Sequence, residues 1–176
     1  MKSRQVVLGI LKRGPQTGYD ITQMFQTSFT FFFDSSAGMV YPALRRLEQD
    51  GCVTKTVVPQ EGKPNKNVYE ITQAGLDEFA DYLKSPVEPE IKKSDFLARL
   101  MFGEYVEPAQ IVKIIKDEVE FQKQESEVIK ARLEEFSPGH TAVSSTQELA
   151  YQYGLTANIS KIEFFEKWLK DHPDGV

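Results

Sequence analysis

Four basic side chains in this sequence could bind a polyanion, and they fall into two groups. Arg45 and Arg46 lie in a stretch with helical periodicity, and Lys63 and Lys66 lie in a turn-forming segment, P-Q-E-G-K-P-N-K. A guanidinium group donates paired hydrogen bonds to a phosphate or to the edge of a guanine, and an ammonium group adds a compact positive charge. Basic residues are also common on faces that are only solvated. Which chemistry applies therefore depends on the elements that carry them.

The stretch Ser35–Gly51 has the apolar spacing of a helix. Val40, Leu44 and Leu47 recur at intervals of four and three residues, which places them on one face. Because Pro42 has no backbone N–H to donate, a kink or loose turn is expected there. A face of small and basic residues can approach a polyanion closely. The face opposite the apolar one carries Ser35, Gly38, Pro42, Arg45 and Gln49, with Arg46 at its flank.

A β-hairpin is predicted directly after this helix. Two short runs, Val53–Val58 and Asn67–Ile71, are rich in Val, Thr and Tyr and flank the segment that holds Lys63 and Lys66. Two further helical stretches precede residue 35. The order helix, helix, helix, hairpin, helix is that of a winged helix-turn-helix, in which the third helix enters the major groove of DNA and the hairpin touches the flanking backbone. The predicted DNA-binding residues are Tyr19, Ser35, Ser36, Met39, Tyr41, Arg45, Arg46, Lys63 and Lys66.

Two tyrosines in this set have a second interpretation. Thr17 and Asp20 have the spacing of a capping box, so the second helix should begin there, with Tyr19 in its first turn. The Tyr19 hydroxyl could reach a phosphate, or its ring could pack against the hairpin. Tyr41, next to Pro42, could contact the DNA backbone or could shape the start of the third helix.

The second half of the chain is predicted to be helical and to depend on another chain. A fourth helix, Gln73–Leu83, capped by Thr72, precedes a proline-containing linker that separates domain 1–86 from domain 87–176. Helices follow at Ser94–Gly103, from Glu107 to about Phe136, and from a capping box at Ser145 to about Leu169. So small a unit cannot cover two long apolar stripes, which favours a homodimer. The inward positions predicted are Leu76, Phe79, Ala80, Leu83, Phe96, Leu97, Leu100, Met101, Ile111, Ile115, Val119, Ile129, Leu133, Phe136, Leu149, Ile159, Ile162, Phe165 and Leu169.

The formal charge of −5 is concentrated in the second half. Residues 1–86 hold 10 Lys and Arg against 9 Asp and Glu, whereas residues 87–176 hold 11 against 17. A local positive field at the contact is enough to release counterions from DNA, and two copies side by side would strengthen it. The single cysteine, Cys52, and the lack of a long apolar run or a signal-type cleavage pattern predict a cytoplasmic protein without a membrane span.

Several short motifs resemble one known family. T-G-Y-D-I at Thr17–Ile21, M-V-Y-P-A-L-R-R-L-E-Q-D-G at Met39–Gly51, G-K-P-N-K-N-V-Y-E-I-T at Gly62–Thr72 and D-F-L-A-R-L-M-F-G at Asp95–Gly103 are similar to the PadR family of transcriptional regulators. The resemblance covers nearly the whole chain. It implies a homodimer, and a small effector bound between the winged and helical domains or at the dimer interface. Family members that respond to phenolic acids are repressors, which implies an aromatic effector at residues that remain unknown.

Other chemistries find no support in the sequence. Its two histidines, His140 and His172, do not cluster with cysteine or carboxylates, so no metal site is predicted. The sequence lacks G-x-S-x-G, Walker A and G-x-G-x-x-G motifs, so we expect no cofactor and no enzymatic activity.

The sequence therefore predicts a mainly α protein, with an N-terminal winged helix-turn-helix, a small β-hairpin wing and a C-terminal α-helical dimerisation domain. Its expected partners are double-stranded operator DNA, a second copy of itself and a small effector that releases a repressor. The alternative is a winged-helix module that binds another protein, which the net acidity and the aromatic run Phe29–Phe33 favour. An enzyme is the weakest of the three hypotheses.

Overall fold

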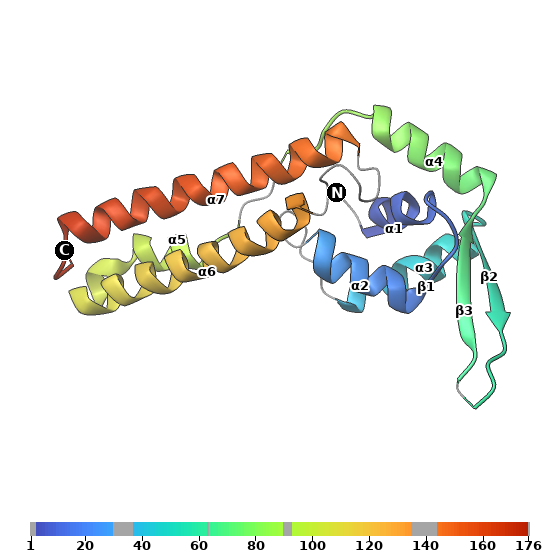
Figure 1. The fold of residues 1–176 in the computed structure, drawn as a ribbon, viewed down its shortest axis with the longest axis horizontal. Helices are drawn as coiled ribbons and strands as arrows, with labels where there is room; N and C mark the ends of the chain where they lie inside the picture. The colour runs from blue at the N-terminus through green and yellow to red at the C-terminus, as the bar shows by residue number, and fades with distance from the viewer. Residues whose placement is uncertain (1–2, 30–36, 63, 90–92, 135–143, 176) are drawn as a thin grey trace. The chain divides into compact units, whose positions relative to one another are not determined.

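The computed structural model of this 176-residue chain describes residues 3–29, 37–62, 64–89, 93–134 and 144–175. By its internal contacts the chain divides into two compact units, Met1–Glu90 and Ile91–Val176. Each unit has its own hydrophobic core. The described elements are mainly helices, and the strands all belong to the first unit (Figure 1). The predicted fold class is confirmed.

The first unit has the element order of a winged helix-turn-helix. Helices α2 and α3 are the two helices of that motif, and β2 and β3 pair to form the wing (Figure 1). The capping box predicted between Thr17 and Asp20 is present at the start of α2, and Thr72 caps α4. The elements are α1 (Ser3–Leu11), β1 (Gln16–Thr17), α2 (Gly18–Ser28), the 3-10 turn η1 (Ala37–Met39), α3 (Val40–Gln49), β2 (Val53–Val58), β3 (Lys66–Ile71) and α4 (Gln73–Lys84).

The three strands form one antiparallel sheet in the order β1-β3-β2. In the wing, Val53 lies opposite Ile71 and Val58 lies opposite Lys66. β1 adds a short pairing at the base, where Gln16 lies opposite Tyr69. Along β2 only Val53 is buried, because the helices cover the base of the hairpin and leave the rest to solvent.

The core of the first unit lies between α1, α2, α3 and the base of the hairpin. The predicted stripe on α3 is confirmed, since Val40, Leu44 and Leu47 are all fully buried. The irregularity expected at Pro42 lies earlier in the chain, where η1 precedes an α-helix that begins at Val40. Pro42 then falls in the first turn, whose N–H groups have no partner within the helix, and its missing donor is tolerated. The buried core residues are Val7, Leu8, Ile10, Leu11, Ile21, Phe25, Val40, Ala43, Leu44, Leu47, Cys52, Val53 and Tyr69.

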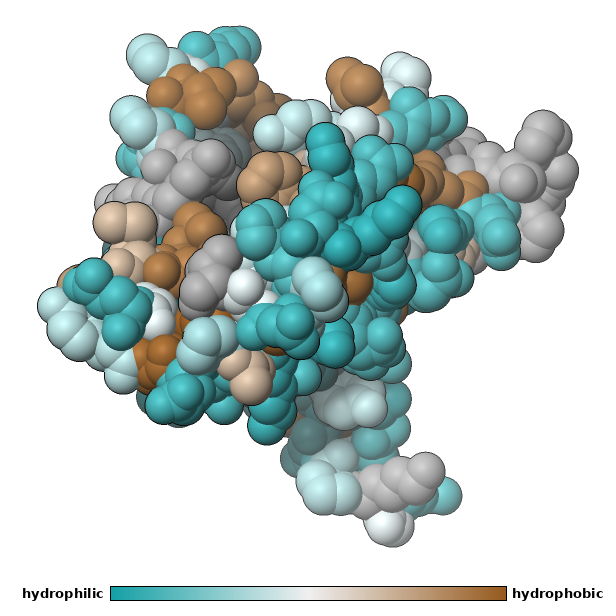
Figure 2. Space-filling model, turned by 90° about the vertical axis from the view of Figure 1, so that its left-hand side faces the viewer, coloured by the Kyte–Doolittle hydropathy of each residue, from teal (hydrophilic) through white to brown (hydrophobic). Residues whose placement is uncertain are grey.

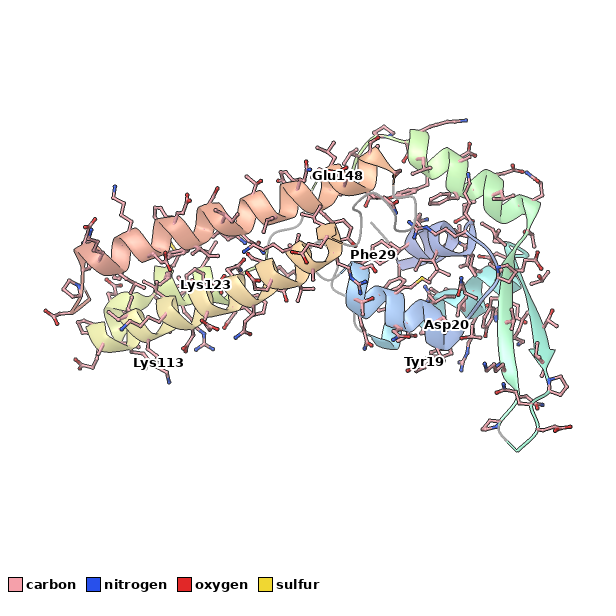
Figure 3. The ribbon with its side chains drawn as sticks, viewed as in Figure 1. Tyr19, Asp20, Phe29, Lys113, Lys123 and Glu148 are labelled. Atoms are coloured by element: carbon pink, nitrogen blue, oxygen red, sulfur yellow. The ribbon has the colours of Figure 1, made fainter. Side chains whose placement is uncertain are left out.

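The second unit is built on two long helices. Its elements are α5 (Asp95–Met101), the 3-10 turn η2 (Gly103–Tyr105), α6 (Pro108–Glu134) and α7 (Ser145–Asp171). α6 and α7 pack along each other, and an ion pair of 2.6 Å joins Lys123 of α6 to Glu166 of α7 (Figures 1 and 3). The core residues of this unit are Ile111, Ile115 and Val119, with Phe96, Leu100, Ile114, Ile162, Phe165, Trp168 and Leu169 packed against them.

Some sequence predictions for α4 and the second unit were wrong. Ser144, not Ser145, is the N-cap of α7, and its capping box closes with Gln147. Several side chains predicted to face inward are exposed in the single chain. In the second unit α5, α6 and α7 cover only part of the apolar surface, and on α4 Leu83 lies in the last turn. Figure 2 shows apolar surface between hydrophilic patches on the side where α7 ends. The exposed ones are Leu83, Leu97, Met101, Leu149 and Ile159.

Candidate nucleic-acid interface

The exposed face of α3 gathers three of the predicted DNA-binding residues. Tyr41, Arg45 and Arg46 are exposed, and they follow the helix on the side away from its buried stripe. Among the described residues, neither Arg45 nor Arg46 forms an ion pair. Both guanidinium groups are therefore available to a polyanion. Met39, at the start of the same helix, is half-buried.

The start of α2 adds Tyr19 to this face and lies beside Tyr41 of α3. Tyr19, in the first turn of α2, is 69% exposed, which disfavours the alternative that it packs against the hairpin (Figure 3). Tyr41 is 48% exposed, and its ring lies over Gly18, the first residue of α2. The hydroxyl group of Tyr41 therefore lies beside Gly18, the residue that precedes Tyr19 in the sequence.

The wing carries one described candidate and one lysine with a different role. Lys66, at the start of β3, is exposed. Lys55 of β2 instead pairs with Glu48 of α3 at 3.0 Å, so its charge is partly neutralised and the pair fixes the wing to α3. Three further candidates, Ser35, Ser36 and Lys63, lie outside the described residues.

An ionic cluster holds the end of α3 against α1 and α4. The guanidinium group of Arg4 donates to Glu78 through Nε at 2.6 Å and Nη2 at 2.7 Å, and it also donates to Asp50, the C-cap of α3. The hydrogen bond to Glu78 is the main reason that the pKa of Arg4 is raised. The same bond lowers the pKa of Glu78 below its usual value. Both groups are charged at neutral pH, and the pair is part-buried.

Cys52 lies inside this cluster. Its thiol is 3.3 Å from both Arg4 Nη2 and Glu78 Oε2. Burial, followed by the nearby Glu78 carboxylate, raises the pKa of Cys52 above that of a free thiol. A raised pKa and burial suit a structural cysteine and not a nucleophile.

The N-cap of α4 is hydrogen-bonded to the backbone that follows α3. The Thr72 hydroxyl donates to the carbonyl of Gly51 at 2.7 Å, and the Thr72 N–H donates to the carbonyl of Cys52 at 3.0 Å. A side chain at Gly75 would place its Cβ 2.2 Å from that Cys52 carbonyl oxygen, so only glycine fits. We call Thr72, Gly75, Gly51 and Cys52 the α4 clasp. The clasp and the Arg4 cluster fix where α3 ends.

No local motif in the sequence predicts the Arg4 cluster or the contact between Tyr41 and Gly18. Arg4 and Glu78 are 74 positions apart, and neither belongs to a local motif. Gly18 was visible within T-G-Y-D-I, but its contact is made with a residue of another helix. Thr72 did give a local signal, since it was predicted as the cap of α4.

The described residues show neither a metal cluster nor a helix that could cross a membrane. Within the described ranges, no group of three or more His, Cys, Asp and Glu side chains could hold a metal ion. None of the described helices is long and apolar enough to span a bilayer. His172 stacks on Trp168 at 4.7 Å between ring centroids, and His140 lies outside the described residues.

The fold and the exposed face of α3 define a winged helix-turn-helix protein of the transcriptional-regulator class. The family described as "Transcriptional regulator PadR-like family" matches residues 7–81. The PadR-like transcriptional regulator BC1756 from Bacillus cereus is 37% identical, has a TM-score of 0.85, and is matched over 97% of both chains. This chain therefore belongs to the PadR-like family, whose members are transcriptional regulators and not enzymes.

Two other proteins have the same fold over almost their whole length. The structure of smu.1604c from Streptococcus mutans UA159 is 39% identical, with a TM-score of 0.91, and the match covers 97% of this chain and 99% of that one. The Negative transcriptional regulator PadR of Bacillus subtilis is 24% identical over 170 residues, which are 95% of this chain and 93% of that protein.

The Bacillus subtilis PadR has been solved with two ligands. Its complex with operator DNA has a TM-score of 0.80 at 22% identity and covers 95% of this chain and 96% of that one. Its complex with p-coumaric acid has a TM-score of 0.70 at 21% identity and covers 94% and 92%. At these identities the likeness shows a shared fold.

Proposed function

We propose that this protein is a dimeric repressor that binds operator DNA through α3 and the wing and is released by a small aromatic effector. The observation that carries DNA binding is the division of α3 into two faces. Val40, Leu44 and Leu47 are fully buried, whereas Arg45 and Arg46 are exposed and form no ion pair within the described residues. The operator complex of the related Bacillus subtilis PadR supports the same use of this fold.

Each residue has a proposed role on DNA. Arg45 and Arg46 contact guanine edges or phosphates from α3 in the major groove. Tyr19, Ser35, Ser36, Met39 and Tyr41 contact the backbone or base edges near the helix ends. Lys63 and Lys66 of the wing follow the sugar-phosphate backbone and contribute affinity without reading sequence.

We assign DNA binding to residues 1–86 and dimerisation to residues 87–176. The second unit exposes large apolar side chains along α5 and α7, among them Met101 at 79%, Tyr153 at 76% and Phe164 at 64%. A second copy is a suitable cover, because it would also bring two copies of α3 to successive major grooves about 34–36 Å apart. A palindromic operator follows from that symmetry.

The direction of regulation and the effector are inferred from the relatives. The Bacillus subtilis relative is named a negative regulator, and one of its structures contains p-coumaric acid. We propose that a small aromatic acid weakens DNA binding here too. Its maximum effect equals the difference between its affinities for the free and the DNA-bound protein.

A salt-dependent DNA titration tests the proposal. The purified protein is titrated with a duplex from its own upstream region and with a random duplex, each at several salt concentrations. We expect tighter binding to the cognate duplex and a steep fall in affinity as salt rises. Arg45→Ala should weaken cognate binding by about tenfold or more, while Arg99→Ala, in the second unit, serves as the matched control.

Two outcomes would contradict the proposal. Equal and weak binding to both duplexes, with no salt-dependent preference, would favour the alternative that this module binds another protein. Equal losses for Arg45→Ala and Arg99→Ala would remove α3 from the contact. Adding p-coumaric acid to the cognate complex tests the effector class, and unchanged affinity would exclude this acid as the effector.

A further inference from the structure

Tyr41 of α3 rests directly on the backbone of Gly18. A Cβ atom built on Gly18 would lie 2.7 Å from Tyr41 Cε1, 3.1 Å from Cζ and 3.2 Å from the hydroxyl oxygen. Gly18 itself is buried, while Tyr41 remains 48% exposed. One edge of the ring, with the hydroxyl, therefore lies beside the beginning of α2, while about half of the residue's surface stays open to solvent.

Space, and not backbone conformation, explains the glycine at this position. Gly18 is the first residue of α2, and it is absent from the glycines with positive φ among the described residues. Any L-residue could adopt this backbone, and alanine has the higher helix propensity. What alanine would bring is a Cβ closer to the Tyr41 ring than atoms normally approach.

The backbone under the ring is held firmly. The Thr17 hydroxyl accepts a hydrogen bond from Asp20 N–H at 3.1 Å, and the Asp20 carboxylate accepts from the Thr17 hydroxyl at 2.7 Å. The Thr22 hydroxyl donates to the Gly18 carbonyl at 2.7 Å. Strand pairing places Thr17 opposite Val68 of the wing. Because the support is anchored, a larger residue at position 18 would displace the exposed ring and not the helix.

We propose that Gly18 is a positioning residue for DNA binding, because its missing side chain lets Tyr41 lie flat and holds the Tyr41 hydroxyl toward the DNA backbone. The inference rests on the proposed function, since it requires Tyr41 to face DNA. A hydroxyl group in this place donates to a phosphate, which contributes affinity on every sequence and does not distinguish bases. Gly18 would thus act on DNA without touching it.

A double-mutant cycle tests this role. Gly18→Ala should weaken binding to the cognate and the random duplex by a similar factor, about three- to tenfold, which is the range for one lost hydrogen bond. Its melting temperature should stay near that of the wild type, because the displaced ring can move into solvent. In a Tyr41→Ala or Tyr41→Phe background, Gly18→Ala should weaken binding no further.

Gly9→Ala is the matched control. Gly9 is a helical glycine in α1 that also lies under an aromatic ring, since its Cβ would be 3.1 Å from Phe79. The Phe79 ring belongs to α4 and not to the proposed DNA-binding face. We therefore expect Gly9→Ala to bind DNA like the wild type, in the presence or absence of Tyr41→Ala. A loss after Gly18→Ala that is matched by Gly9→Ala would indicate general loosening and would overturn the inference.

The remaining outcomes separate this inference from the proposed function. If the wild type binds no DNA, the proposed function fails and this inference fails with it. If the wild type binds and Gly18→Ala binds equally well, or loses the same factor in the Tyr41→Ala background, only the inference fails. If Gly18→Ala does not fold, the double variant Gly18→Ala/Tyr41→Ala decides, because it lacks the clash. The double variant should fold and bind DNA like Tyr41→Ala. If it does not fold, the contact between Tyr41 and Gly18 is not what requires glycine, and the inference is overturned.

Discussion

Arg4, near the start of α1, holds Glu78 of α4 with two hydrogen bonds of 2.6 and 2.7 Å. The same guanidinium group reaches Asp50 at the end of α3. One side chain therefore connects three helices of the winged domain at the point where α3 ends. Two nitrogens of the planar guanidinium group each donate to one oxygen of the carboxylate, and the single ammonium group of a lysine could not reproduce this bidentate pair.

Removing Arg4 should destabilise the protein. Arg4→Ala leaves the part-buried Glu78 carboxylate without its main partner, and we expect a loss of about 1–2 kcal/mol in the free energy of unfolding, measured by urea denaturation. Arg99→Ala breaks an exposed pair with Asp95, whose side chains are 60% and 81% exposed, and should change little. Equal effects of the two substitutions would refute a structural role for the Arg4 cluster.

The Glu78 carboxylate should make stability depend on pH below neutrality. Because Arg4 lowers the folded-state pKa of Glu78 from its ordinary 4.5, the stabilisation is fully present above about pH 5. It is lost as pH falls below 4.5 and through the lowered folded-state pKa. The difference in unfolding free energy between the wild type and Glu78→Gln should therefore be constant from pH 7 to 5 and shrink below that. A difference that stays constant to pH 3 would contradict this assignment.

Lys66 should contribute affinity without specificity. Lys66→Ala is expected to weaken binding to cognate and random duplexes by the same factor and to reduce the slope of log affinity against log salt by about one. Lys130→Ala, which removes an exposed lysine of α6 paired with Glu127 at 2.7 Å, should leave that slope unchanged. An unchanged slope for Lys66→Ala would place the wing tip away from phosphates.

A charge on the apolar surface of α7 should separate the proposed dimer. Phe164 is 64% exposed in the single chain, so Phe164→Glu should not unfold it. Across a dimer interface the same carboxylate would be buried without a partner, and we expect the dissociation constant to rise by more than tenfold in sedimentation experiments. Tyr19→Glu, at an exposed aromatic residue of the first unit, should leave the association unchanged. A Phe164→Glu protein that associates like the wild type would move the interface elsewhere.

Local patterns predicted the winged domain because its elements are specified by neighbouring residues. The stripe Val40, Leu44 and Leu47 follows the period of one helix, and the Thr17 and Asp20 capping box needs only three residues of spacing. The N-cap of α7 was placed one residue late, because Ser144 and Ser145 are equally good caps by type.

Other features depend on distant or external partners, which no local pattern contains. The Arg4 cluster joins residues 74 positions apart, and the contact between Tyr41 and Gly18 joins two helices. Met101 and Leu149 have apolar types at helical spacing, yet both are exposed in the single chain. The periodicity identified a face to be covered and could not say that this chain leaves it open.

The α4 clasp restricts which sequences can keep this fold. The Cys52 backbone carbonyl lies next to Gly75 and cannot move aside. Every other amino acid at position 75 must therefore disrupt the packing of α4 against the backbone that joins α3 to the wing. Next to Gly18 stands a movable ring, so variation there is compatible with folding. As related sequences diverge, glycine should therefore be kept at position 75 because the protein cannot fold without it. Glycine should be kept at position 18 only where selection acts on the function of the folded protein.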